Sequence, residues 1–124
     1  MKKILNPTSH GVFDYLMVCV LALAPTALNL GHPATEIGFA LAAVYLVFSL
    51  MTAYPLSVAK KLSFAYHGVL DFYLSIGIAL FGVVGIRNPG GLFFVCAGAI
   101  MFLGFVTTDY SEPLPIGPGT RNPA

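Results

Sequence analysis

Four nearly uncharged apolar stretches constrain the fold of this chain more than any other feature. They cover residues 10–30, 35–54, 63–86 and 91–108. A bilayer core about 30 Å thick is spanned by a helix of roughly 20 apolar residues. Only 9% of the residues are charged, against about a quarter in a soluble domain, so most of the chain must be solvated by lipid. The sequence predicts one all-α membrane domain with four transmembrane helices, because lipid offers no partners for unpaired backbone groups and the runs lack barrel-like alternation.

The basic side chains are sorted between the two sides of the predicted bundle. One side would carry Lys2, Lys3, Lys60, Lys61 and Arg121, and the other side only Arg87. Short cytoplasmic segments are enriched in Lys and Arg, so both termini and the middle loop are predicted to be cytoplasmic. The net charge of +1 gives no indication of a nucleic-acid partner. The expected surroundings are a lipid bilayer, with a homo-oligomer left open.

Local signals suggest where the helices begin and end. Thr8 or Ser9 is expected to cap the first helix, with Pro7 just outside it. Pro25 removes a backbone donor and is expected to kink or loosen that helix. The segment 56–65 is expected to continue helically into the third span, with its lysines reaching the headgroups. The tail 111–124, rich in Pro and Gly, is expected to be flexible.

An internal repeat divides the chain into two units. His10-Gly11-Val12-Phe13-Asp14 returns fifty-seven residues later as His67-Gly68-Val69-Leu70-Asp71. We therefore predict two helical hairpins, at about 7–55 and 62–110, that run parallel about an approximate two-fold axis along the membrane normal. When the two units are aligned with a gap of one residue in the loop, Thr52 also matches Thr108 and Tyr54 matches Tyr110, although this second-helix match is weak.

The layout of each unit resembles a known family. A first span that ends in Leu23-Ala24-Pro25, a short loop and a second apolar span are similar to the SPW-repeat membrane proteins, a bacterial group of two-helix repeats. Ala24-Pro25-Thr26 stands where that family has Ser-Pro-Trp, and the second copy has Phe81-Gly82-Val83 there. The resemblance implies a small multi-pass protein of the bacterial cytoplasmic (inner) membrane, and it implies no particular activity.

The repeated His and Asp residues are the strongest site candidates. His10 and Asp14 are four residues apart, as are His67 and Asp71, so each pair shares one face of a helix. Buried charges in membrane helices usually face the bundle interior, so all four should meet between the first and third spans. Gly11 and Gly68 would let these helices approach closely.

Three interpretations of this cluster stay open. The leading one is structural: the four side chains lock helix ends together at the cytoplasmic side, in a protein with a structural or interaction role. The second is a proton or ion pathway of a transporter or channel, since histidine titrates near neutral pH. Against it, the second and fourth spans carry no matching charge at mid-depth. The third is a metal or haem site held by His10, Asp14, His67 and Asp71.

Other features predict less about function. No nucleophile–base set is evident, so we expect neither an enzyme nor a dedicated cofactor. Small residues in the third and fourth spans have two interpretations, a packing face or ordinary membrane composition: Ser75, Ala79, Gly82, Gly98 and Gly104. Four tyrosines near the cytoplasmic boundary are interpreted as an aromatic belt: Tyr15, Tyr54, Tyr66 and Tyr110.

Overall fold

The chain folds into four helices, which the sequence predicted. The computed structural model describes residues 3–52 and 61–110. The helices are α1 (Pro7–Ala27), α2 (Ala34–Met51), α3 (Phe64–Val84) and α4 (Pro89–Thr107). Each is long and apolar enough to cross a membrane. Within the described ranges there is no β-strand, only two isolated bridges between chain segments.

Two of the predicted helix starts are wrong. The side chain of Asn6, not Thr8 or Ser9, caps α1 by accepting from the Ser9 N–H at 2.9 Å, and Pro7 is the first helical residue. Proline suits that position because its missing N–H would be unpaired there anyway. Pro25 lies inside α1, which continues to Ala27, and the kink expected there stays a prediction. Residues 61–63 are not helical, since Ser63 caps α3 instead; the rest of the predicted helical linker, and the tail 111–124, lie outside the described residues.

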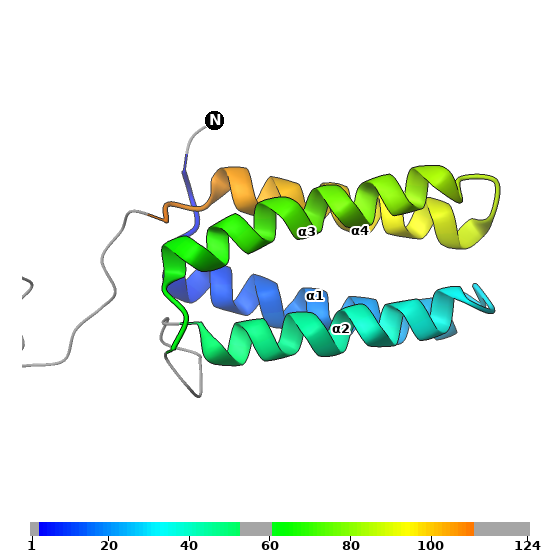
Figure 1. The fold of residues 1–124 in the computed structure, drawn as a ribbon, viewed down its shortest axis with the longest axis horizontal. Coiled ribbons are helices and arrows are strands. Elements are labelled where there is room, and N and C mark those ends of the chain that lie inside the picture. The colour runs from blue at the N-terminus through cyan, green and yellow to red at the C-terminus, as the bar shows by residue number, and fades with distance from the viewer. Residues whose placement is uncertain (1–2, 53–60, 111–124) are drawn as a thin grey trace, which may run out of the picture.

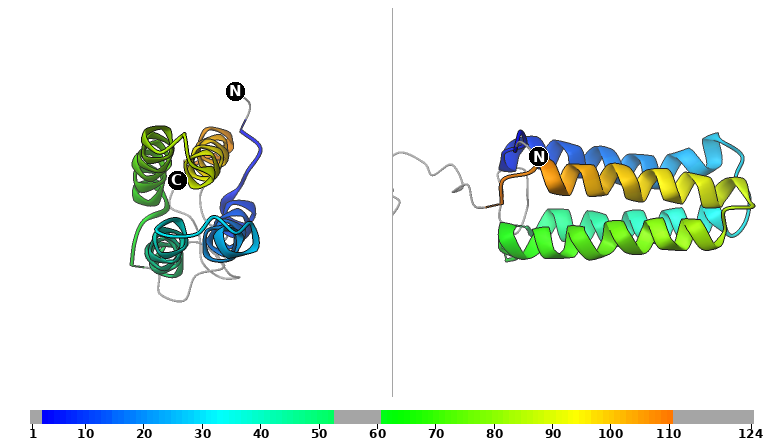
Figure 2. Two further views of the ribbon diagram at one scale, coloured as in Figure 1. Left: turned by 90° about the vertical axis from the view of Figure 1, so that its right-hand side faces the viewer. Right: turned by 90° about the horizontal axis from the view of Figure 1, so that it is seen from above.

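The helices form two antiparallel hairpins that stand side by side. α1 packs on α2, α3 packs on α4, and α1 also contacts α4. Both hairpin turns lie at one end of the bundle (Figure 1). Viewed end-on, the helices occupy the corners of a square, with α1 diagonally opposite α3 (Figure 2). We call the end with the turns the turn end, and the other the linker end.

Small residues bring α3 and α4 together, which favours the packing-face interpretation of their sequence pattern. A Cβ on Gly98 would lie 2.6 Å from the Ala79 backbone nitrogen and 2.7 Å from the Ser75 carbonyl oxygen. A Cβ on Gly82 would lie 2.5 Å from the Val95 nitrogen. Neither space admits a side chain, so glycine sets the distance between these helices.

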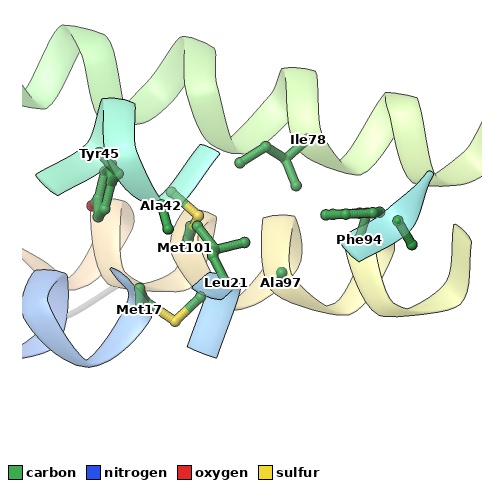
Figure 3. Close-up of a cluster of buried hydrophobic side chains, with 9 residues drawn as sticks. Met17, Leu21, Ala42, Tyr45, Ile78, Phe94, Ala97 and Met101 are labelled. Carbon is green, nitrogen blue, oxygen red and sulfur yellow. The ribbon is translucent and has the colours of Figure 1, made fainter. Parts of the chain in front are cut away.

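All four helices contribute to the bundle core (Figure 3). The core side chains are Met17, Leu21, Ala34, Ala42, Tyr45, Ile78, Phe94, Ala97 and Met101. Large apolar side chains such as Leu23, Val84 and Leu103 point outward instead. In water this outer surface would be unfavourable, whereas in lipid it is the expected exterior of a bundle.

Candidate functional site: a buried His/Asp centre

The repeated His and Asp residues meet inside the linker end of the bundle. We call His10, Asp14, His67 and Asp71 the His/Asp centre. His10 and Asp14 lie on α1, and His67 and Asp71 lie on α3. None of the four is more than 3% exposed. Residues fifty-seven positions apart therefore share one enclosed polar site.

Each histidine of the centre lies between both aspartates. His10 Nε2 is 3.1 Å from Asp14 Oδ1 and 2.9 Å from Asp71 Oδ2. His67 Nε2 is 3.0 Å from Asp14 Oδ2 and 3.2 Å from Asp71 Oδ1. Each carboxylate thus gives one oxygen to each imidazole, and the contacts close a ring across the diagonal between α1 and α3. Two of the four contacts join one hairpin to the other.

Two threonines hold the outer nitrogens of the imidazoles. His10 Nδ1 lies 2.7 Å from Thr108 Oγ1, and His67 Nδ1 lies 2.6 Å from Thr52 Oγ1. Each hydroxyl donates its only proton at 2.6 Å to a carbonyl four residues earlier in its own helix, that of Gly104 for Thr108 and that of Phe48 for Thr52. Each threonine must then accept from the imidazole, so both rings carry a proton on Nδ1.

Two phenols donate to the carboxylates. The Tyr45 hydroxyl lies 2.6 Å from Asp14 Oδ1 and 3.0 Å from Asp71 Oδ1. The Tyr110 hydroxyl donates to Asp71 Oδ2 at 2.8 Å. Tyr110 follows α4, and both its burial and the neighbouring Asp71 charge raise the pKa of its phenol. That phenol therefore stays protonated and remains a donor.

The backbone around the centre also connects the two hairpins. The segment before α1 bonds to the end of α4, with Leu5 N–H donating to the Thr107 carbonyl at 3.0 Å. The segment before α3 bonds to the end of α2, with Leu62 N–H donating to the Met51 carbonyl at 2.8 Å. Each first helix is thus tied to the second helix of the other hairpin.

The other predicted site residues have more varied surroundings. Gly68 makes room for an aromatic ring rather than a helix, since its Cβ would lie 2.8 Å from Tyr110 Cδ1. Gly11 is buried. Pro25 lies toward the turn end, where its ring fits against Gly38. Gly104 faces the ring of Phe13 on α1 rather than α3.

Four residues hydrogen-bond to the centre although the sequence did not predict it: Tyr45, Thr52, Thr108 and Tyr110. The weak alignment that pairs Thr52 with Thr108 contained the signal for the two threonines. Tyr110 was assigned to the aromatic belt, but its hydroxyl points inward to Asp71. Tyr45 gave no signal, because a single tyrosine in an apolar helix is most simply a core residue.

The centre contains the side chains that commonly bind a metal ion. One ligand atom from each of its four residues can be chosen so that all lie within 4.8 Å of one another. No family model, curated protein or solved structure matches this chain. The interpretation of the site therefore depends on its own geometry.

Proposed function

We propose that this protein is a small integral membrane protein with a structural or interaction role, in which the His/Asp centre joins two hairpins at the cytoplasmic end. The observation that carries the proposal is the crossed contact pattern. His10 on the first hairpin lies 2.9 Å from Asp71 on the second, and His67 on the second lies 3.0 Å from Asp14 on the first. Removing one partner would leave a buried group without its counter-charge.

The proposal includes two parallel hairpin repeats. Its support is that the contacts of the two units correspond: His10 with Thr108 matches His67 with Thr52, and the bridge of Leu5 to Thr108 matches that of Leu62 to Thr52. Membership of the SPW-repeat family, and with it a bacterial inner membrane, stays a prediction from the resemblance. A homo-oligomer stays a prediction as well.

The proposed orientation places both termini in the cytoplasm. Its support is the charge distribution, since Lys3 and Lys61 belong to the linker end and Arg87 to the turn end. We expect a membrane-impermeant maleimide to label Arg87→Cys in intact cells, in a background with Cys19 and Cys96 replaced by Ala. Lys61→Cys should react only after the membrane is opened. The reverse pattern would invert the proposed topology.

A transport pathway has less support. Toward the turn end, the buried side chains of the described helices are apolar, among them Leu21, Ile78 and Phe94. An ion crossing that part of the bundle would lose its hydration without gaining polar partners. Haem also fits poorly, because carboxylate oxygens about 3 Å from each Nε2 occupy the space that a macrocycle would need.

The role of the His/Asp centre as a joint between the two hairpins is tested with His10→Ala combined with His67→Ala. We expect a lower thermal unfolding temperature in detergent and unchanged proton or ion flux in proteoliposomes. His32→Ala is the matched control, since this histidine lies in an exposed turn. An unchanged unfolding temperature in the double variant would refute the joint role, and flux lost without a stability change would favour the transporter.

A further inference from the structure

We infer that the His/Asp centre binds one divalent transition-metal ion through the Nε2 atoms of His10 and His67 and the carboxylates of Asp14 and Asp71. The inference rests on the proposed joint between the hairpins and names the ion that completes it. A metal would connect α1 to α3 directly, because each helix supplies one nitrogen ligand and one carboxylate.

The tautomer of both imidazoles is the first argument. Since Thr52 and Thr108 give their protons to backbone carbonyls, each imidazole must donate from Nδ1. In a neutral ring, Nε2 then carries a lone pair directed at the carboxylates. A lone pair facing two anions is repelled unless a cation or a proton lies between them. The threonines therefore prepare both rings for the same kind of partner.

The surroundings of His10 Nε2 favour a metal over a proton. Asp14 Oδ1 and Asp71 Oδ2 lie 3.1 and 2.9 Å from this nitrogen, yet neither is placed to accept a hydrogen bond from it. An imidazolium N–H would align with one carboxylate oxygen, because hydrogen bonds weaken steeply away from linearity. His10 Nε2 thus lies close to two carboxylate oxygens without a hydrogen bond to either, an arrangement that a cation shared by the three atoms would satisfy.

The size of the centre suits a metal ion. Two ligands on adjacent corners of a tetrahedral or octahedral shell lie about 3.0–3.4 Å apart when each is about 2.1 Å from the metal. The four imidazole–carboxylate separations are 2.9, 3.0, 3.1 and 3.2 Å. Ligand atoms that spread up to 4.8 Å would have to close by about 0.6 Å to reach the roughly 4.2 Å between opposite corners of an octahedral shell, and by about 1.4 Å to fit a tetrahedral one. The centre is therefore close to the spacing that a bound ion would impose.

The charge and chemistry of the ligands define the class of metal. Two carboxylates balance the charge of a divalent ion when both imidazoles are neutral, which removes the cost of a net charge inside the membrane. Imidazole favours zinc, iron, nickel or copper over calcium and magnesium, and carboxylates suit harder divalent ions such as manganese. The centre has no thiolate ligand among its four residues, so Zn²⁺, Fe²⁺ and Mn²⁺ are the expected occupants.

The surrounding hydrogen bonds are those of a metal site. In such sites the second nitrogen of each histidine is held by an acceptor, and the ligating carboxylates accept hydrogen bonds of their own. Here the threonines hold both imidazoles, and Tyr45 and Tyr110 donate to the carboxylates. These four residues orient the ligands without supplying them.

The direct test is metal analysis of the whole protein purified through a tag without histidine. We expect about one ion per chain after growth with added Zn²⁺, Fe²⁺ or Mn²⁺, retained through gel filtration. Replacement with Co²⁺ should give visible d–d bands whose intensity reports the coordination geometry. His32→Gln is the matched control and should keep its metal, because His32 lies outside the centre.

Two sets of variants keep the test informative. Asp14→Asn and Asp71→Asn should lose the ion. If either fails to fold, Thr52→Val combined with Thr108→Val leaves all four ligands in place and removes only the acceptors. This double variant should weaken metal affinity by about 10- to 100-fold, the usual effect of losing outer-shell partners. Metal affinity unchanged in the threonine variant would overturn the argument from the tautomer.

The outcomes separate this inference from the proposed joint. Wild-type protein with less than about 0.1 ion per chain, and no rise in unfolding temperature on adding any of the three metals, would overturn the metal site. If the His10→Ala and His67→Ala variant is then still destabilised, the joint stands as an ion-pair network. Bound metal together with an unfolding temperature that falls on chelation supports both proposals.

Discussion

The two ends of the bundle contain the same local pattern in opposite environments. In each case a histidine lies four residues before a carboxylate on a helix or at its start: His10 with Asp14, His67 with Asp71, and His32 with Glu36. At the linker end these side chains are at most 4% exposed, whereas His32 and Glu36 at the turn end are 84% and 57% exposed. The three pairs have the same sequence spacing, and only their burial distinguishes the two pairs of the His/Asp centre from the pair at the turn end.

The difference is one of partners as well as solvent. Water solvates His32 and Glu36, so their contact can open at little cost. The buried pairs contact one another, two threonines and two tyrosines. Because His10 reaches Asp71 and His67 reaches Asp14, a change at one residue affects both hairpins. Four matched substitutions test this contrast, from the largest expected effect to the smallest.

Removing a buried carboxylate should have the largest effect. Asp14→Ala takes one oxygen from each imidazole and leaves Tyr45 with a single acceptor in the centre. We expect the free energy of unfolding to fall by about 3–5 kcal/mol, the usual cost of breaking a buried ion pair. Reversible unfolding in mixed detergent micelles measures it. Glu36→Ala at the turn end should leave stability unchanged, and equal effects at both ends would remove the contrast.

Loss of the bridging phenol should come next. Tyr45→Phe keeps the ring in the core and removes the donor to both Asp14 and Asp71. We expect a loss of about 1–3 kcal/mol, because two buried carboxylate oxygens would lose a hydrogen-bond donor. Tyr73→Phe is the control, since Tyr73 is 68% exposed. A Tyr45 variant as stable as the Tyr73 variant would mean that the phenol is not needed by the centre.

The sequence was sufficient to predict the helices and the meeting of the repeated residues. Four long apolar runs define four spans, and four-residue spacing places His and Asp on one helix face. Helix ends were less predictable, because Asn6 and Ser9 are both acceptable caps and the choice depends on the local backbone.

The partners of the centre could not be predicted for a different reason. Thr108 is 98 positions from His10, and Tyr45 is 31 positions from Asp14. No local periodicity encodes contacts over such separations, which depend on how the hairpins pack. The threonines at least recur in the repeat, whereas the position of Met101 in the second hairpin matches that of Tyr45 in the first. Because Tyr45 has no counterpart in the second hairpin, the repeat could not predict its contact with the centre.

The threonines offer a comparison within the centre itself. Thr52→Val and Thr108→Val each remove the acceptor for one imidazole while keeping side-chain shape. Each should cost about 1–2 kcal/mol, and the two values should agree because their contacts match. Thr107→Val is the control, since that hydroxyl bonds only to backbone carbonyls of its own helix. A large difference between Thr52 and Thr108 would show that one hairpin contributes more to the joint.

The smallest loss of stability is expected for Gly68→Ala, because the Tyr110 ring next to it can shift. In Gly68→Ala the new Cβ would meet Tyr110 Cδ1 at 2.8 Å and push the phenol away from Asp71. Because a side chain at the end of a helix can shift, we expect a loss of about 1 kcal/mol, the low end for overpacking. Gly77→Ala, with no atom within 4 Å of its Cβ, should be neutral or slightly stabilising through higher helix propensity. If Gly68→Ala is also neutral while Tyr110→Phe is not, the ring moves without losing Asp71, and the hydrogen bond rather than the close fit holds this side of the centre.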